Sequence, residues 1–166
     1  DSATWWLTVA RLHDRARRSR PAEALYRAIL RRQPGKAVAL TGLGRQLLRQ
    51  RRYEEAADVW GQVVAIRPRT PNAHFQHARS LHRLGRLSAA SQSYLRVLEL
   101  VPAHEKARVA LQKLAVRLAD RRPEKGGDPE MAFRICQRLD VIRDGEALEN
   151  QQLREAFTNL AQQKQQ

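Results

Sequence analysis

The chain has 166 residues, of which 42% are hydrophobic, so it can form one ordinary domain or a short repeat array with a continuous core. It contains no apolar run near the roughly 20 residues that a transmembrane helix needs, and its N-terminus lacks the basic start and long apolar centre of a signal peptide. A single cysteine, Cys136, excludes an internal disulfide and favours a reducing, cytoplasmic location. Because the chain begins with Asp1 and not with Met, we expect a fragment of a longer protein.

The positive charge is high and unevenly distributed. The formal net charge is +14, and residues 1–119 hold 23 Lys and Arg against 8 Asp and Glu, whereas residues 120–166 hold 8 against 9. A basic surface is therefore expected on the first part of the chain, where it would attract acidic partners. An arginine-rich genome would produce the same excess without a function, since net charge informs partners and solubility but not fold.

The chain repeats itself with a period of 34 residues. Four sets of residues keep this spacing: Pro34, Pro68 and Pro102; Ala22, Ala56 and Ala90; Tyr26, Trp60 and Tyr94; Ile29, Val63 and Val97. Each proline follows the last turn of an expected helix, where its ring stops the helix. The coincidence of these sets indicates a helical repeat array.

The central unit, residues 37–68, reads as two short amphipathic helices that need neighbours. Gly44 and Ala56 are small where the two helices must approach closely, and Trp60 is large enough to fill the gap between them. Helices of this length are marginal in water when isolated, so we expect further repeats to cover their apolar faces.

This pattern resembles the tetratricopeptide repeat family, strongly over residues 3–102 and weakly to about residue 119. The central unit carries the residues that mark the family's two helices: Leu40, Leu43, Gly44, Tyr53, Ala56, Trp60 and Pro68. Two departures stand out. The turn at Arg17 and Arg18 lacks the usual Gly, and His74 and His77 replace bulky apolar residues. The resemblance implies an all-α fold, a right-handed α-solenoid of antiparallel helix pairs.

The expected elements follow the repeats in chain order. Helices are predicted at residues 4–17, 21–32, 37–50, 53–66, 71–84 and 87–100, which form units 3–34, 37–68 and 71–102, and at 105–119, which begins a degenerate fourth unit. The predicted domains are residues 1–119, an inserted Gly- and Pro-rich loop at 120–129, and residues 129–166.

The last part of the chain is expected to hold two more helices. One begins at Pro129 with Asp128 as its cap, and its buried side is predicted to carry Phe133, Cys136, Leu139 and Ile142. A final helix from Glu146 to about Gln163 would cap the solenoid, connect it to a further domain or form a homodimer contact, and the Gln-rich end is expected to fray.

The sequence carries no constellation typical of an enzyme. Cys136 has no His near it in sequence, and His74, His77 and His82 share one helix without a Cys or carboxylate that would complete a metal site. Since His74 and His77 fall at packing positions of the repeat, we interpret them as packed, hydrogen-bonded histidines. We predict that this fragment is not an enzyme and binds no cofactor or metal.

Binding is better supported, because three sets of residues repeat in register on the first helix of each unit. An inner basic column comprises Arg11, Arg45, Arg79 and Lys113; an outer one comprises Arg15, Arg49, Arg83 and Arg117; a mixed column comprises Leu7, Thr41, Phe75 and Val109. The family resemblance implies that these helices line a concave groove. The outer column can equally be a solvated surface, since basic residues near a helix C-terminus interact favourably with its dipole.

Three functions remain open at this point. The first is a protein–protein interaction module or scaffold whose basic groove binds an acidic or amphipathic protein segment. The second is polyanion binding, to nucleic acid or an acidic polysaccharide, for which an aromatic content of 5% offers few stacking surfaces. The third is the non-catalytic repeat region of a larger enzyme such as a glycosyltransferase, sulfotransferase or hydroxylase. Gly42 and Gln76 disfavour the family's clamp for chaperone C-termini.

Overall fold

The computed structural model describes residues 2–120 and 127–142, and every regular element in these ranges is an α-helix. The helices are α1 (Ser2–Arg15), α2 (Ser19–Arg32), α3 (Ala37–Arg49), α4 (Tyr53–Ile66), α5 (Pro71–Arg83), α6 (Leu87–Leu100), α7 (Glu105–Asp120) and α8 (Pro129–Ile142). The all-α repeat fold predicted from the sequence is therefore confirmed. The predicted final helix from Glu146 lies outside the described residues, as does residue range 121–126 of the predicted loop.

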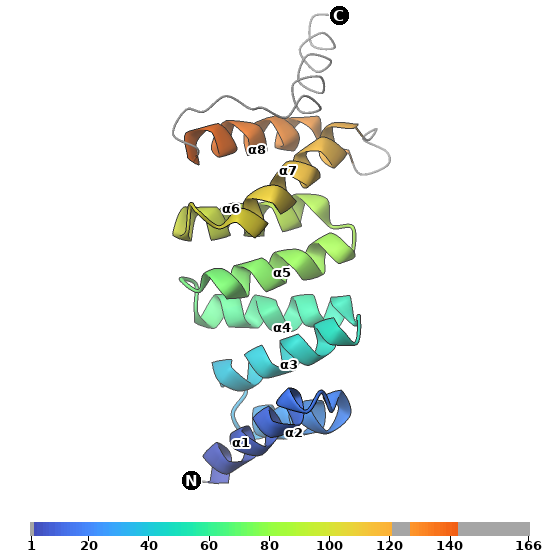
Figure 1. Ribbon diagram of the computed structural model, residues 1–166, viewed down its shortest axis with the longest axis vertical. Coiled ribbons are helices and arrows are strands. Elements are labelled where there is room, and N and C mark those ends of the chain that lie inside the picture. Colours follow the sequence, from blue (N-terminus) through green and yellow to red (C-terminus); the bar gives the residue numbers. More distant parts are fainter. Residues whose placement is uncertain (1, 121–126, 143–166) are drawn as a thin grey trace, which may run out of the picture. The chain divides into compact units, whose positions relative to one another are not determined.

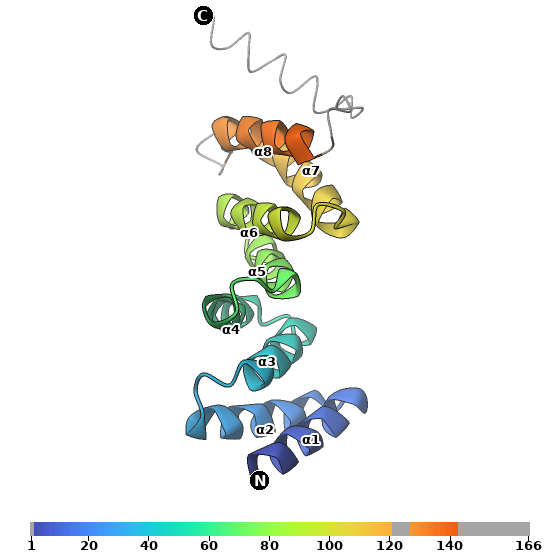
Figure 2. The ribbon, with the colours of Figure 1, turned by 90° about the vertical axis from the view of Figure 1, so that its left-hand side faces the viewer.

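The chain divides into two compact units, one ending at Gly85 and the other beginning at Arg86. The first contains α1 to α5, which follow one another through the unit in both views of the ribbon (Figures 1 and 2). The second contains α6 to α8. The division into domains at residues 119 and 129 remains a prediction. None of the helices in the described ranges is long and apolar enough to cross a membrane.

Two glycines let α3 accept aromatic side chains from both neighbouring helices. Tyr26 of α2 and Trp60 of α4 are buried, with 1% and 0% of their surface exposed. A Cβ atom on Gly44 would lie 2.7 Å from the Trp60 indole, and one on Gly42 would collide with the Tyr26 ring. The close approach predicted at Gly44 is thus present, and Gly42 serves the same purpose on the side of α2.

The turn inside each repeat requires a left-handed residue at one register position. Arg17 and Arg51 have φ values of 55° and 61°, and Gly85, which follows at the same spacing, has a φ of 76°. After α3, the Arg52 N–H donates to the Leu47 carbonyl and the Arg51 N–H to that of Leu48, which is the Schellman pattern. The hydrogen bonds of the helix end therefore impose the left-handed conformation even where arginine replaces glycine.

A buried carboxylate connects α2 to the turn between α3 and α4. Glu23 is 6% exposed and accepts hydrogen bonds from Gln50 Nε2 at 2.6 Å and from Arg52 Nη1 at 2.7 Å, and it forms an ion pair with Arg27. Burial alone would raise the pKa of the Glu23 carboxyl, but these hydrogen bonds and the charges of Arg27 and Arg52 outweigh burial and lower it. The ionised carboxylate therefore joins the first repeat to the second.

Gln46, one turn before Gln50 in the chain, is buried without a comparable partner. Its side chain is 0% exposed, and neither end of its amide has a hydrogen-bond partner among the described residues. The residues at the same register position are Leu12, Ser80 and Leu114. Gln46 thus places a polar group where the repeat elsewhere carries an apolar or small residue.

The histidines of α5 pack as the sequence suggests. His74 is buried, and its Nε2 lies 2.8 Å from the carbonyl oxygen of Pro68. Burial lowers the pKa of the His77 imidazole, and the nearby His74 lowers it further, whereas Asp58 acts in the opposite direction. Both histidines belong to the packing between α4 and α5.

In the second unit, α8 buries Cys136 and Leu139 as predicted, but not Phe133. The prediction placed Phe133 on the buried side, but Phe133 is 47% exposed. The buried residues are Ala132, Ile135, Cys136 and Leu139, which form one stripe at helical spacing. The prediction was therefore wrong for Phe133, because Ala132 and Ile135 occupy the buried stripe beside Cys136 and Leu139. The predicted cap is present: Asp128 Oδ1 accepts a hydrogen bond from the Met131 N–H at 2.9 Å.

Candidate functional site

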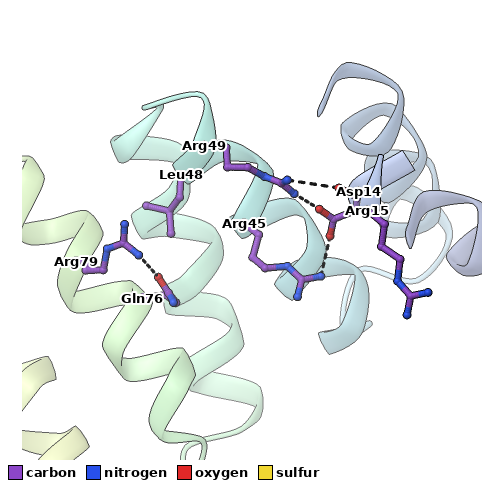
Figure 3. A pocket seen from close by; sticks show the side chains of 7 residues that line it. All are labelled: Asp14, Arg15, Arg45, Leu48, Arg49, Gln76 and Arg79. Carbon is purple, nitrogen blue, oxygen red and sulfur yellow. Dashed lines mark hydrogen bonds and ion pairs between the residues drawn. The ribbon is translucent and has the colours of Figure 1, made fainter. Parts of the chain in front are cut away.

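The first unit contains a hollow of 520 Å³ on the side formed by α1, α3 and α5, which are the first helices of the three repeats. We call it the arginine hollow. Its lining consists of Asp14 and Arg15 from α1, Arg45, Leu48 and Arg49 from α3, and Gln76 and Arg79 from α5. Four of these seven side chains are guanidinium groups, and Figure 3 shows how they lie.

Asp14 holds two of the four arginines. Its carboxylate pairs with Arg45 Nη2 at 2.9 Å through one oxygen and with Arg49 Nη2 through the other, and the Arg49 side chain also reaches the Asp14 carbonyl oxygen (Figure 3). The Asp14 side chain is only 13% exposed, while those of Arg45 and Arg49 are 51% and 39% exposed. Both guanidinium groups are thus oriented by the protein and still reach solvent.

The other two arginines retain free hydrogen-bonding capacity. Arg79 Nη1 donates to Gln76 Oε1 at 3.2 Å, and no ion pair of Arg79 occurs within the described residues. Arg15 forms neither a hydrogen bond nor an ion pair through its side chain in the same ranges, and in Figure 3 it points away from Asp14. Because each guanidinium carries five N–H donors, the hollow offers many more donors than Asp14 can satisfy.

The structure brings together part of the predicted basic columns. Arg45 and Arg79 of the inner column and Arg15 and Arg49 of the outer column line the arginine hollow. Arg11 and Arg83 do not line it, although both are exposed on the same helices. Three predicted residues belong to the second unit: Lys113, Arg117 and Val109. A groove that continues over all the repeats therefore remains a prediction.

The mixed column contributes little to this hollow. Leu7 packs against the hydrophobic core of the first unit, and the Thr41 hydroxyl donates to the Ala37 carbonyl oxygen of its own helix at 2.8 Å. Phe75 is partly buried and does not line the hollow. The apolar contact surface of the arginine hollow comes instead from Leu48, seven residues after Thr41.

Sequence reasoning missed Asp14, which organises the arginine hollow. A signal was available, because Asp14 is the one acidic residue within the sequences of α1, α3 and α5. The later repeats carry Leu48 and His82 at the same register position. An isolated carboxylate beside two columns of arginines indicates an ion pair between neighbouring repeats.

Residues 2–120 and 127–142 contain no group of three or more His, Cys, Asp or Glu side chains that could hold a metal ion. What the arginine hollow can do chemically is bind anions, through charge-assisted hydrogen bonds with a fixed geometry.

The period of 34 residues and the packing described above decide the family, together with a direct sequence match. The tetratricopeptide repeat profile matches residues 7–68 and, in an overlapping second copy, residues 41–105. The chain belongs to the tetratricopeptide repeat family. No curated protein matches the chain significantly.

Several solved structures share the tetratricopeptide repeat fold of this chain. A crystal structure of MamA has a TM-score of 0.72 at 14% identity, over 96% of this chain and 82% of that one. MamA from Desulfovibrio magneticus RS-1 gives 0.67 at 16%, over 88% and 78%. The first repeat domain of Spaghetti (RPAP3), bound to the HSP90 peptide SRMEEVD, gives 0.66 at 22%, over 70% and 93%. At these identities the likeness concerns the fold alone.

Proposed function

We propose that this chain is a protein–protein interaction module whose arginine hollow binds the acidic side chains of a partner protein segment. The observation that carries the proposal is a hollow of 520 Å³ lined by four guanidinium groups and a single carboxylate, which pairs with only two of them. A structural neighbour, the first repeat domain of Spaghetti (RPAP3), is bound to a peptide that contains two consecutive Glu residues. That precedent supports a peptide as the class of ligand.

The contacts of the hollow suggest how an acidic segment would bind. Arg15 and Arg79 have donors to spare, so they would grip an incoming carboxylate, and a guanidinium can do so through two parallel hydrogen bonds. Asp14 holds Arg45 and Arg49 in place, which reduces the side-chain entropy lost when a ligand binds them. Leu48 would contact an apolar side chain next to the carboxylate.

Reversal of one charge tests the proposal. A fluorescein-labelled peptide EEVEEL, titrated against the full chain and followed by fluorescence anisotropy, should bind the Arg79→Glu variant about tenfold more weakly, because the variant loses donors and gains repulsion. Arg69→Glu makes the same charge change at an exposed position of the same unit outside the hollow, and should change the affinity less than threefold. Equal weakening by both variants would show attraction to the net charge and contradict the proposal.

The excess charge of the first unit favours polyanion binding as a second candidate. Residues 1–85 hold 17 Lys and Arg against 6 Asp and Glu. A random oligonucleotide titrated at several salt concentrations separates this function from the first, since phosphate binding weakens steeply with salt. Loss of all oligonucleotide binding near physiological salt, with peptide binding retained, would eliminate the second candidate.

A further inference from the structure

The first unit has a second hollow, of 370 Å³, which shares no residue with the arginine hollow. It lies where α2, α3 and α4 meet, on the side of the second helices of the repeats. We call it the leucine hollow, after the three leucines of its apolar lining, which consists of Leu30, Pro34, Leu40, Leu43 and Val59. Its volume is at the lower end of the roughly 300–1,000 Å³ typical of ligand pockets, so it suits one large apolar side chain.

Two arginines at the edge of the leucine hollow differ in their availability. Arg27 is committed, since it pairs with Glu23 and, at 3.0 Å, with Glu55. Arg31, one turn further along α2, is exposed and makes no hydrogen bond or ion pair in the part of the chain that the structure describes. A free cation thus stands next to an apolar depression.

The next repeat does not reproduce this hollow in the same form. Leu40 and Leu43 are followed at the 34-residue spacing by His74 and His77. At the same spacing, Arg27 is followed by Gly61 and the free Arg31 by Ala65. His74 is hydrogen-bonded to the Pro68 carbonyl oxygen, and the His77 imidazole lies over Gly61, with 3.6 Å between its Nε2 and the place of a Cβ atom. The leucines and the free arginine are therefore a property of the first junction and are not imposed by the fold.

We propose that the leucine hollow is a second docking site, which binds a protein segment carrying a bulky apolar residue beside Asp or Glu. The apolar side chain enters between Leu30 and Val59, and the acidic residue pairs with Arg31. A second copy of this chain is a poor occupant, because the first unit holds 17 Lys and Arg against 6 Asp and Glu and two such surfaces repel each other. An acidic partner has the complementary charge. Since the two hollows share no lining residue, one chain could hold two partner segments.

The test uses the full ¹⁵N-labelled chain and two peptides, EELWEE and EESSEE. We expect EELWEE to shift the amide resonances of Leu30, Leu40 and Gln62, while EESSEE, which has the same charge and no apolar residue, leaves them in place. Arg31→Glu should weaken EELWEE binding at these resonances about fivefold or more, because it replaces the free cation with a repelling charge. The matched control is Arg32→Glu, an exposed neighbour with the same charge change that does not line the hollow, and it should weaken binding less than twofold.

A second variant tests the apolar part independently. Gln62→Trp places a large ring at the exposed edge of the hollow and should compete with the peptide without altering the charge. Shifts confined to the resonances of the arginine hollow, or equal weakening by Arg31→Glu and Arg32→Glu, would overturn the second docking site. Neither result bears on the proposed function of the arginine hollow, which Arg79→Glu tests separately.

Discussion

At the scale of single residues, the packing of α3 depends on matching a small residue to a large ring. The Trp60 indole packs on Gly44. In the preceding repeat, Tyr26 stands at the position of Trp60 and Ala10 at the position of Gly44. The larger indole thus faces the smaller residue. Because protein interiors are close-packed, a single methyl group is felt at such a contact.

We predict that Gly44→Ala destabilises the first unit by about 1–3 kcal/mol, because the added Cβ would overlap the Trp60 indole. Thermal or urea unfolding followed by circular dichroism measures the change. Trp60→Tyr should restore part of the loss in the Gly44→Ala background, which a double-mutant cycle detects as a favourable coupling. Gly35→Ala, with nothing within 4 Å of the new atom, is the control and should be nearly neutral.

Gln46→Leu is expected to stabilise the chain by about 1–2 kcal/mol, since it removes a buried amide that lacks partners and introduces the residue found at positions 12 and 114 of the same register. Gln50→Leu in the same assay should have the opposite sign, because it deletes the hydrogen bond to Glu23. A destabilised Gln46→Leu variant would show that the amide has a role in packing that its contacts do not reveal.

At the scale of the elements, the turns keep their geometry while their sequences vary. Arg51→Gly should raise the unfolding free energy by about 0.5–1 kcal/mol. The variant removes the cost of about 1–2 kcal/mol that a left-handed conformation imposes on a non-glycine residue. Part of this gain is offset because glycine loses more backbone entropy on folding. Arg69→Gly, at an exposed turn position without a positive φ, should instead be slightly destabilising. Denaturant unfolding of both variants shows whether their changes in unfolding free energy have opposite signs.

The hydrogen bonds of Glu23, which connect α2 to the turn between α3 and α4, make the stability of the first unit sensitive to acid pH. Because the pKa of Glu23 is lower in the folded chain than its ordinary value of 4.5, its contribution is fully present above pH 4.5 and is lost as the pH falls through the folded pKa. Glu23→Gln should therefore lower the unfolding free energy at neutral pH. The unfolding free energy of this variant should also decrease less than that of the unaltered chain between neutral and acid pH. Glu130→Gln, at an exposed ion pair with Arg134, should leave the shape of the pH profile nearly unchanged.

At the scale of the whole molecule, the positive charge is concentrated in the first unit, so association with acidic ligands should be steered electrostatically. We predict that the association rate of EEVEEL falls about threefold or more between 50 and 200 mM NaCl, while its dissociation rate changes less. Stopped-flow fluorescence measures both rates. A peptide with Gln in place of every Glu should show no such dependence, and equal salt dependence of the two peptides would contradict steering.

The sequence was sufficient for the fold because the repeat supplies redundant signals. Pro34, Pro68 and the aromatic positions each define the same period, so helix positions follow even though every single signal is weak. The site was predicted only in part. The spacing of four residues placed Arg45 and Arg49 on one face of the helix. The carboxylate that holds them, Asp14, lies in the preceding repeat, 31 and 35 residues earlier in the sequence. A repeat period identifies only residues that recur at its spacing, and Asp14 has no acidic equivalent in the later repeats.

The two glycines of α3 have a consequence for how this array could be altered or rebuilt. Gly42 receives the Tyr26 ring from the repeat before it, and Gly44 receives the Trp60 indole from its own repeat. A 34-residue block cut at the repeat boundary and grafted elsewhere would therefore keep the Gly44–Trp60 match but leave behind Tyr26, the partner of Gly42. The transferable module of this protein is the three-helix span 19–66, and recombination or design that respects this span, and not the sequence period, should preserve its core.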